Sequence, residues 1–130
     1  MKLAENFDLS KFECRDGTAV PEEYMDNVKK LAENLQVIRE EIGQPVIIIS
    51  GYRSPDYNKR CGGVKKSQHL LAKAADIRVK GMHPRELGEI VKRLIKEGRL
   101  HSGGVGVYTT FVHYDIRGFN ARWYGKGMKP

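Results

Sequence analysis

The chain has 130 residues, enough for one domain with one hydrophobic core, and its 40% apolar content excludes an intrinsically disordered protein. Its net charge of +7 favours anionic partners, such as nucleic acid, acidic lipid or an anionic cell-wall polymer. No apolar run is long enough to cross a membrane, and the first residues lack the apolar core of a secretory signal.

The first part of the chain predicts an irregular segment, a long helix and a strand. Residues 1–19 carry turn signals without periodicity, so we expect no regular structure there. Between Pro21 and Gly43, apolar residues recur every three or four positions, which predicts an amphipathic helix that ends at the glycine. Residues 46–50 are mostly β-branched, and this short run is typical of a buried strand.

The middle of the chain alternates short elements with a loop. Ser54 is expected to cap a short helix that starts at Pro55 and ends at the glycine pair 62–63. Residues 64–75 have no clean period and are predicted to form a loop. Residues 76–79 alternate between apolar and polar side chains, as a strand does.

The last part predicts a second long helix and a hairpin. The helix runs from Pro84 to Gly98, and the hairpin pairs residues 105–108 with 112–116. Residues 118–130 are expected to form an irregular basic tail. Together the elements predict one α+β domain over residues 1–130, with a small antiparallel sheet and flanking helices.

The two cysteines, Cys14 and Cys61, are too few for a disulfide scaffold, and neither belongs to a Cys-x-x-Cys pair. We interpret them as buried or idle thiols, although a single disulfide between them stays an open alternative.

Three residues indicate chemistry: His69, Asp76 and His113. Two imidazoles and one carboxylate can hold zinc and leave a fourth position for water, as catalytic zinc sites do. His69 and Asp76 are seven residues apart. On a helix this spacing separates the two residues by about 10 Å of rise, and on a straight strand it puts their side chains on opposite faces. The chain must therefore bend between them if both bind one ion. His113 shares a strand face with Asp115, and antiparallel pairing could bring Asp76 to His113.

Each of these residues has an ordinary structural alternative. His69 could be a loop histidine, Asp76 a strand-end aspartate and His113 a core histidine, so the argument rests on their combination. His83 precedes a proline at a helix start and His101 lies in a glycine-rich turn, so both are predicted not to be ligands.

The strings around these residues resemble those of the M15 zinc peptidases, which include D-alanyl-D-alanine carboxypeptidases, peptidoglycan endopeptidases and phage endolysins. The matching positions are Ser50-Gly51-Tyr52-Arg53-Ser54-Pro55, Asn58, Gly62-Gly63, Ser67-x-His69, Ala74-x-Asp76, Gly103-Gly104-x-Gly106-x-Tyr108 and Phe111-Val112-His113-x-Asp115. The resemblance covers roughly residues 6–123. It implies an α+β fold with a small antiparallel sheet, and Zn²⁺ held by His69, Asp76 and His113.

The resemblance also suggests roles for other residues. Arg53 would face the scissile carbonyl or its oxyanion, with a turn-pinning salt bridge as the alternative. Ser67 would bind substrate or orient its loop, with a local turn bond as the alternative. Tyr108 belongs to an aromatic-rich last third of the chain and is a candidate for substrate contact, although such side chains more often pack in a core.

Two positions depart from the pattern of many family members. Ala72 stands where many have glycine, so the bend there must tolerate a Cβ atom. Thr110 stands where many carry an acidic general base, which threonine cannot replace. Asp115 is the nearest acidic alternative, and it could act either as that base or as a residue that orients a zinc ligand.

These observations predict a zinc-dependent peptidase that cleaves peptide bonds of bacterial peptidoglycan. The alternative is a non-catalytic, zinc-stabilised cell-wall binding domain. A nucleic-acid binder would rest on charge alone, because no nucleic-acid-binding motif is present. We expect a monomer whose partners are peptidoglycan peptides, not nucleic acid. It would be made in the cytoplasm without a signal peptide and act at the cell wall or periplasm, after phage-type release or export by another route.

Overall fold

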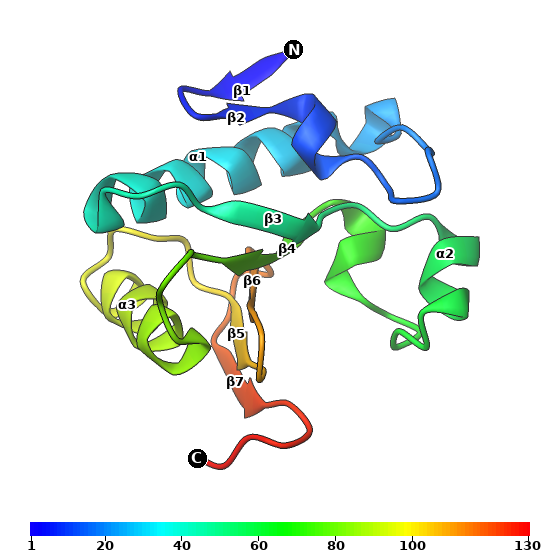
Figure 1. The fold of residues 1–130 in the computed structure, drawn as a ribbon. Helices are drawn as coiled ribbons and strands as arrows, with labels where there is room; N and C mark the ends of the chain where they lie inside the picture. The colour runs from blue at the N-terminus through cyan, green and yellow to red at the C-terminus, as the bar shows by residue number, and fades with distance from the viewer.

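The computed structural model describes residues 1–130, which fold around a five-stranded sheet (Figure 1). Along the chain the elements are β1 (Lys2–Ala4), β2 (Phe7–Asp8), the 3-10 helices η1 (Leu9–Phe12) and η2 (Glu22–Tyr24), α1 (Met25–Ile42), β3 (Ile47–Ser50), α2 (Pro55–Arg60), the 3-10 helix η3 (Gln68–Leu71), β4 (Ala74–Arg78), α3 (Pro84–Lys96), β5 (Gly104–Val107), β6 (Val112–Asp115) and β7 (Ala121–Tyr124). None of the helices combines the length and hydrophobicity that a membrane span requires.

The main sheet has the strand order β3-β4-β6-β5-β7. Its neighbouring strands are antiparallel except for β5 and β7, which run parallel. The prediction of an α+β fold is confirmed, and the sheet is mixed rather than wholly antiparallel. The reason is the connection after β6, which returns to the start of β5, where the amide of Ala121 bonds the carbonyl of Gly103 at 3.3 Å.

The two faces of the sheet have different partners because side chains alternate along each strand. On β6, Val112 and Tyr114 point into the core, and the Tyr114 hydroxyl donates to the His101 carbonyl at 2.8 Å. Gly88 of α3 lies so close to this face that an added Cβ would be 2.6 Å from a Val107 methyl. His113 and Asp115 alternate with the core residues and therefore lie on the opposite face.

The helix ends follow the sequence signals. Gly43 ends α1 with a left-handed φ of +73°. The Ser54 hydroxyl accepts from the amide of Tyr57 at the start of α2. Nδ1 of His83 accepts from the amide of Arg85 and so caps α3.

Three segments predicted to be irregular contain regular structure. Residues 1–19 form the β1–β2 hairpin and η1, residues 64–75 contain η3 and the start of β4, and residues 118–130 contain β7. The hairpin is too short and too irregular in register to show alternation, and β7 is held by a partner distant in sequence. Cys14 is buried, Cys61 is exposed, and both are free thiols, so they do not form a disulfide.

Candidate metal centre

One row of paired residues crosses all five strands of the sheet. Ser50 of β3 pairs with Asp76 of β4, Asp76 with His113 of β6, His113 with Gly106 of β5, and Gly106 with Trp123 of β7. Directly paired side chains on one face lie about 5 Å apart. The antiparallel pairing of β4 and β6 therefore brings Asp76 and His113 together, as the sequence predicted.

His69 reaches the same place from the loop before β4. The Ser67 hydroxyl caps η3 by accepting from the His69 amide at 3.2 Å, and the helix ends at Ala72 in the left-handed conformation with φ +57°. Ala72 is the predicted bend between the two candidate ligands, and here it does carry a Cβ atom. The turn lets His69 face Asp76 across seven positions of sequence.

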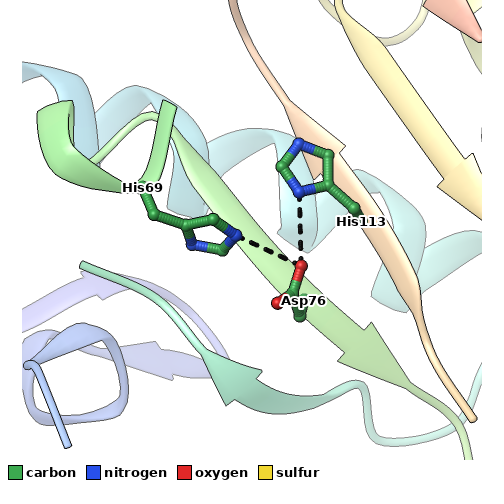
Figure 2. A group of neighbouring side chains, drawn as sticks. All are labelled: His69, Asp76 and His113. Atoms are coloured by element: carbon green, nitrogen blue, oxygen red, sulfur yellow. Dashed lines mark hydrogen bonds and ion pairs between the residues drawn. The ribbon is translucent and has the colours of Figure 1, made fainter. Parts of the chain in front are cut away.

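The three side chains converge on one point and are buried (Figure 2). Oδ1 of Asp76 is 3.2 Å from Nε2 of His69 and 3.3 Å from Nδ1 of His113. One possible ligand atom from each residue lies within 4.8 Å of the others. Burial would raise the pKa of Asp76, but hydrogen bonds from His113 and His69 outweigh it and hold that pKa well below the usual range.

The outer nitrogen of each imidazole is occupied. Nδ1 of His69 lies 2.7 Å from the Gly51 carbonyl, and Nε2 of His113 lies 2.7 Å from Oδ2 of Asp115. Both partners are acceptors, so each outer nitrogen carries the proton, and in the neutral ring each inner nitrogen presents a lone pair. Without a metal, a proton on an inner nitrogen can join that ring to Asp76; when both rings are neutral, two lone pairs and a carboxylate converge on one point, which a cation could occupy. The donor set, two nitrogens and one oxygen, fits Zn²⁺ with an open coordination position.

The family comparison agrees with this geometry: the family model for Peptidase M15 matches residues 3–115. The chain belongs to the M15 peptidase family. No curated protein matches the chain.

Asp115 of this M15 peptidase is fully buried behind His113. Its carboxylate accepts from Nε2 of His113, from the Gly104 amide at 2.9 Å and from the Arg117 guanidinium at 2.9 and 2.7 Å. Burial would raise the pKa of Asp115, but the hydrogen bonds from His113 and Arg117 prevail and lower it. Asp115 therefore contacts the nitrogen of His113 that points away from Asp76, which is where a ligand-orienting carboxylate lies.

A cavity of about 470 Å³ opens over the three candidate ligands in this peptidase. Its wall includes Arg53, Ser67 and Tyr108, so the cavity brings together every predicted site residue except the buried Asp115. Asp76 is the only carboxylate that lines it. Thr110 is exposed in the β5–β6 turn and does not line the cavity.

Arg53 contacts both a candidate ligand and the cavity. Its Nη2 lies 3.2 Å from Oδ2 of Asp76, the oxygen that does not face the histidines, and its Nε donates to the Ser50 hydroxyl at 3.2 Å. These contacts correspond to the turn-pinning alternative, and because Arg53 also lines the cavity, its role towards a scissile carbonyl or oxyanion stays a prediction.

Sequence reasoning missed two participants, the Gly51 carbonyl and Arg117, and it counted Trp123 only as one of several aromatic residues in the last third of the chain. A carbonyl leaves no trace in a sequence, and Arg117 looks like one of many surface cations. A signal for Trp123 was available, since alternate glycines at 104 and 106 within a strand indicate close approach by another group.

Proposed function

We propose that this M15 peptidase is a zinc-dependent enzyme that cleaves peptide bonds of bacterial peptidoglycan. The observation that carries the proposal is the convergence of two inner histidine nitrogens and the Asp76 carboxylate on one buried point. Within the family identified above, such a set supports a metallopeptidase centre rather than a structural cluster.

His69, Asp76 and His113 would hold the metal, and their surroundings fix them before it binds. The Gly51 carbonyl orients one imidazole, Asp115 orients the other, and Arg53 holds the carboxylate. When bound, zinc supplies Lewis-acid activation of water and of the scissile carbonyl.

Arg53 would stabilise the negative charge that develops on the carbonyl oxygen of the substrate. One side of its guanidinium is committed to Ser50 and Asp76, and Nη1 makes only a long contact of 3.5 Å with Asn58. A guanidinium that is held in place and still has unused N–H donors is suited to bind an oxyanion, because it need not reorganise as the charge forms.

The charge of the cavity supports an anionic peptide as substrate. Arg53, Lys66 and Arg117 line it; Asp76 and the buried Asp115 pair with the two arginines, and Lys66 has no ion pair. Peptidoglycan stem peptides carry free carboxylates, and the net charge of +7 favours the anionic wall that contains them. We propose that it acts at the cell wall or periplasm, after phage-type release or another route of export.

A second candidate is a non-catalytic, zinc-stabilised domain that binds the cell wall. The observation that favours it is the lack of a free carboxylate beside the candidate centre: Thr110 replaces the usual acid, and Asp115 is buried and fully engaged. This domain would keep the metal and the cavity without turnover.

Digestion of purified peptidoglycan distinguishes the two candidates. The zinc-loaded protein should release peptide fragments that mass spectrometry identifies, a chelator should abolish the release, and added zinc should restore it. His113→Ala should be inactive, whereas His101→Ala, which removes a histidine outside the centre, should be active. Wall binding without any released fragment would support the binding domain and contradict the peptidase.

A further inference from the structure

We propose that Trp123 is a positioning residue, which holds the phenol of Tyr108 so that its hydroxyl donates a hydrogen bond to an oxygen of the peptide substrate. This inference rests on the proposed function and extends it to β7. That strand lies beyond residues 3–115, which match the family model.

Strand β5 makes room for the indole of Trp123 by presenting glycine. Gly106 pairs with Trp123 in the β5–β7 register, and a Cβ atom on Gly106 would lie 2.3 Å from the indole nitrogen. A Cβ atom on Gly104 would lie 3.0 Å from the far end of the same ring. The indole therefore lies flat across β5 on the cavity face, and its centroid is 5.1 Å from that of His113.

The indole N–H of Trp123 is hydrogen-bonded to Tyr108. Nε1 of Trp123 donates to the Tyr108 hydroxyl oxygen at 2.9 Å. The phenol ring also stacks on Phe111, with centroids 4.5 Å apart and planes 12° from parallel. The edge of the phenol ring lies against the backbone of Gly125, where an added Cβ atom would be 2.0 Å from the ring. Tyr108 is thus held by a hydrogen bond, a stacked ring and the backbone.

The hydrogen bond from Trp123 also decides what Tyr108 can do. A phenol has one O–H donor and accepts through its oxygen. Since the indole N–H occupies an acceptor position and no protein group accepts from the hydroxyl, its proton is available in the cavity that both residues line. The matching partner is an acceptor, and the carbonyl and carboxylate oxygens of a peptide are such groups.

The test is a double-mutant cycle on the zinc-loaded protein. Tyr108→Phe removes the hydroxyl, and Trp123→Phe removes the N–H but keeps a ring beside His113. Each should raise KM for muropeptides, released from walls by muramidase, by roughly two- to tenfold, the effect of one neutral hydrogen bond, with little change in kcat. If Trp123 acts through Tyr108, the double variant should be no worse than Tyr108→Phe.

Three measurements separate positioning from a general structural role. Zinc affinity should be unchanged in both single variants, and a loss in Trp123→Phe would mean that the indole acts on His113 instead. Tyr124→Phe, which removes a phenolic hydroxyl from the next residue of β7 outside the cavity, should keep wild-type KM. Trp123 is the only tryptophan in the chain, so its emission should shift in Tyr108→Phe and not in Tyr124→Phe. Unshifted emission in Tyr108→Phe or additive KM effects would overturn the inference.

The same variants distinguish failure of this inference from failure of the proposed function. If the zinc-loaded wild type cleaves no wall peptide, the proposed function fails, and calorimetric titration with the muropeptides still tests the inference. Binding weakened by roughly two- to tenfold in Tyr108→Phe and Trp123→Phe would support it. Equal affinity in wild type and variants, or no binding at all, would overturn it.

Discussion

Nε2 of His113 donates a hydrogen bond to the buried carboxylate of Asp115 at 2.7 Å. This contact selects which nitrogen of His113 is free, and it turns Nδ1 towards Asp76. The two residues lie two positions apart on one face of β6, so the strand itself sets their spacing.

Asp115→Asn should therefore weaken zinc affinity by roughly ten- to a hundredfold, because a carboxylate that orients a histidine ligand typically contributes that much. Activity should return in excess zinc. A titration of activity against free zinc measures both effects.

The opposite result would assign Asp115 the role of general base. In that case Asp115→Asn would keep normal zinc affinity and lose roughly 10²–10⁴ in rate. Thr110→Glu would then restore activity to the double variant. We expect no such rescue, because the lesion lies at the metal ligand.

Zinc binding should require three residues as ligands: His69, Asp76 and His113. The wild type should bind about one equivalent, as a single site demands. His69→Ala, Asp76→Ala and His113→Ala should each lose it, whereas His101→Ala should keep it, because His101 lies outside the cluster. Metal analysis after dialysis provides the measurement, and full zinc in His69→Ala or His113→Ala would contradict the assignment.

Arg53→Lys should lower kcat by roughly ten- to a thousandfold with little change in KM, because lysine keeps the charge but loses the fork of donors. Steady-state kinetics on muropeptides measure the change. Arg60→Lys is the matched control, since Arg60 is exposed in the same region and its one ion pair joins Asp16. If zinc affinity falls in Arg53→Lys while kcat recovers in excess zinc, Arg53 only holds Asp76.

Ala72→Val should destabilise the fold by about 2 kcal/mol or more, because a β-branched residue is strained at φ +57° and the site is buried. Ala72→Gly should stay within about 1 kcal/mol of wild type, since relief of strain is offset by a lost methyl group and a freer unfolded chain. Urea unfolding of the zinc-free protein measures both changes. Equal stability of the valine and glycine variants would contradict the strained bend.

Asp16 should contribute to stability against acid. Hydrogen bonds from Thr18, Cys14 and Ser54 hold the pKa of Asp16 below its usual range. The unfolded value is about 3.9, so the contribution is complete above that pH and is lost as the pH falls through the lower folded value. Between about pH 5 and pH 2, the free energy of unfolding should therefore fall more steeply with decreasing pH for wild type than for Asp16→Asn. Parallel curves would contradict this role.

The sequence predicts those parts of the fold that rest on local signals. The apolar stripe of α1, its stop at Gly43 and the cap at Ser54 are visible because each acts within a few residues. The convergence of His69, Asp76 and His113 was predicted from a family resemblance and from the need for a bend, not from periodicity.

The remaining features depend on contacts between distant segments. Nothing in residues 121–124 alternates clearly, and β7 exists because β5 offers it a parallel partner. Which nitrogen of each histidine faces the centre likewise depends on the partner of its other nitrogen. Asp115 leaves Nδ1 of His113 free, and the backbone carbonyl of Gly51 leaves Nε2 of His69 free. Trp123 lines the cavity because β7 pairs with β5, which is distant from it in sequence.

The row that joins Ser50, Asp76, His113, Gly106 and Trp123 makes the centre intolerant of misalignment. A slip of one residue between β4 and β6 would turn His113 into the apolar core and bring Tyr114 to the open face. A slip of β7 would set a side chain other than Trp123 against Gly106. A chain that folded out of register would therefore lack the aligned ligands, even if it were as compact as the native protein.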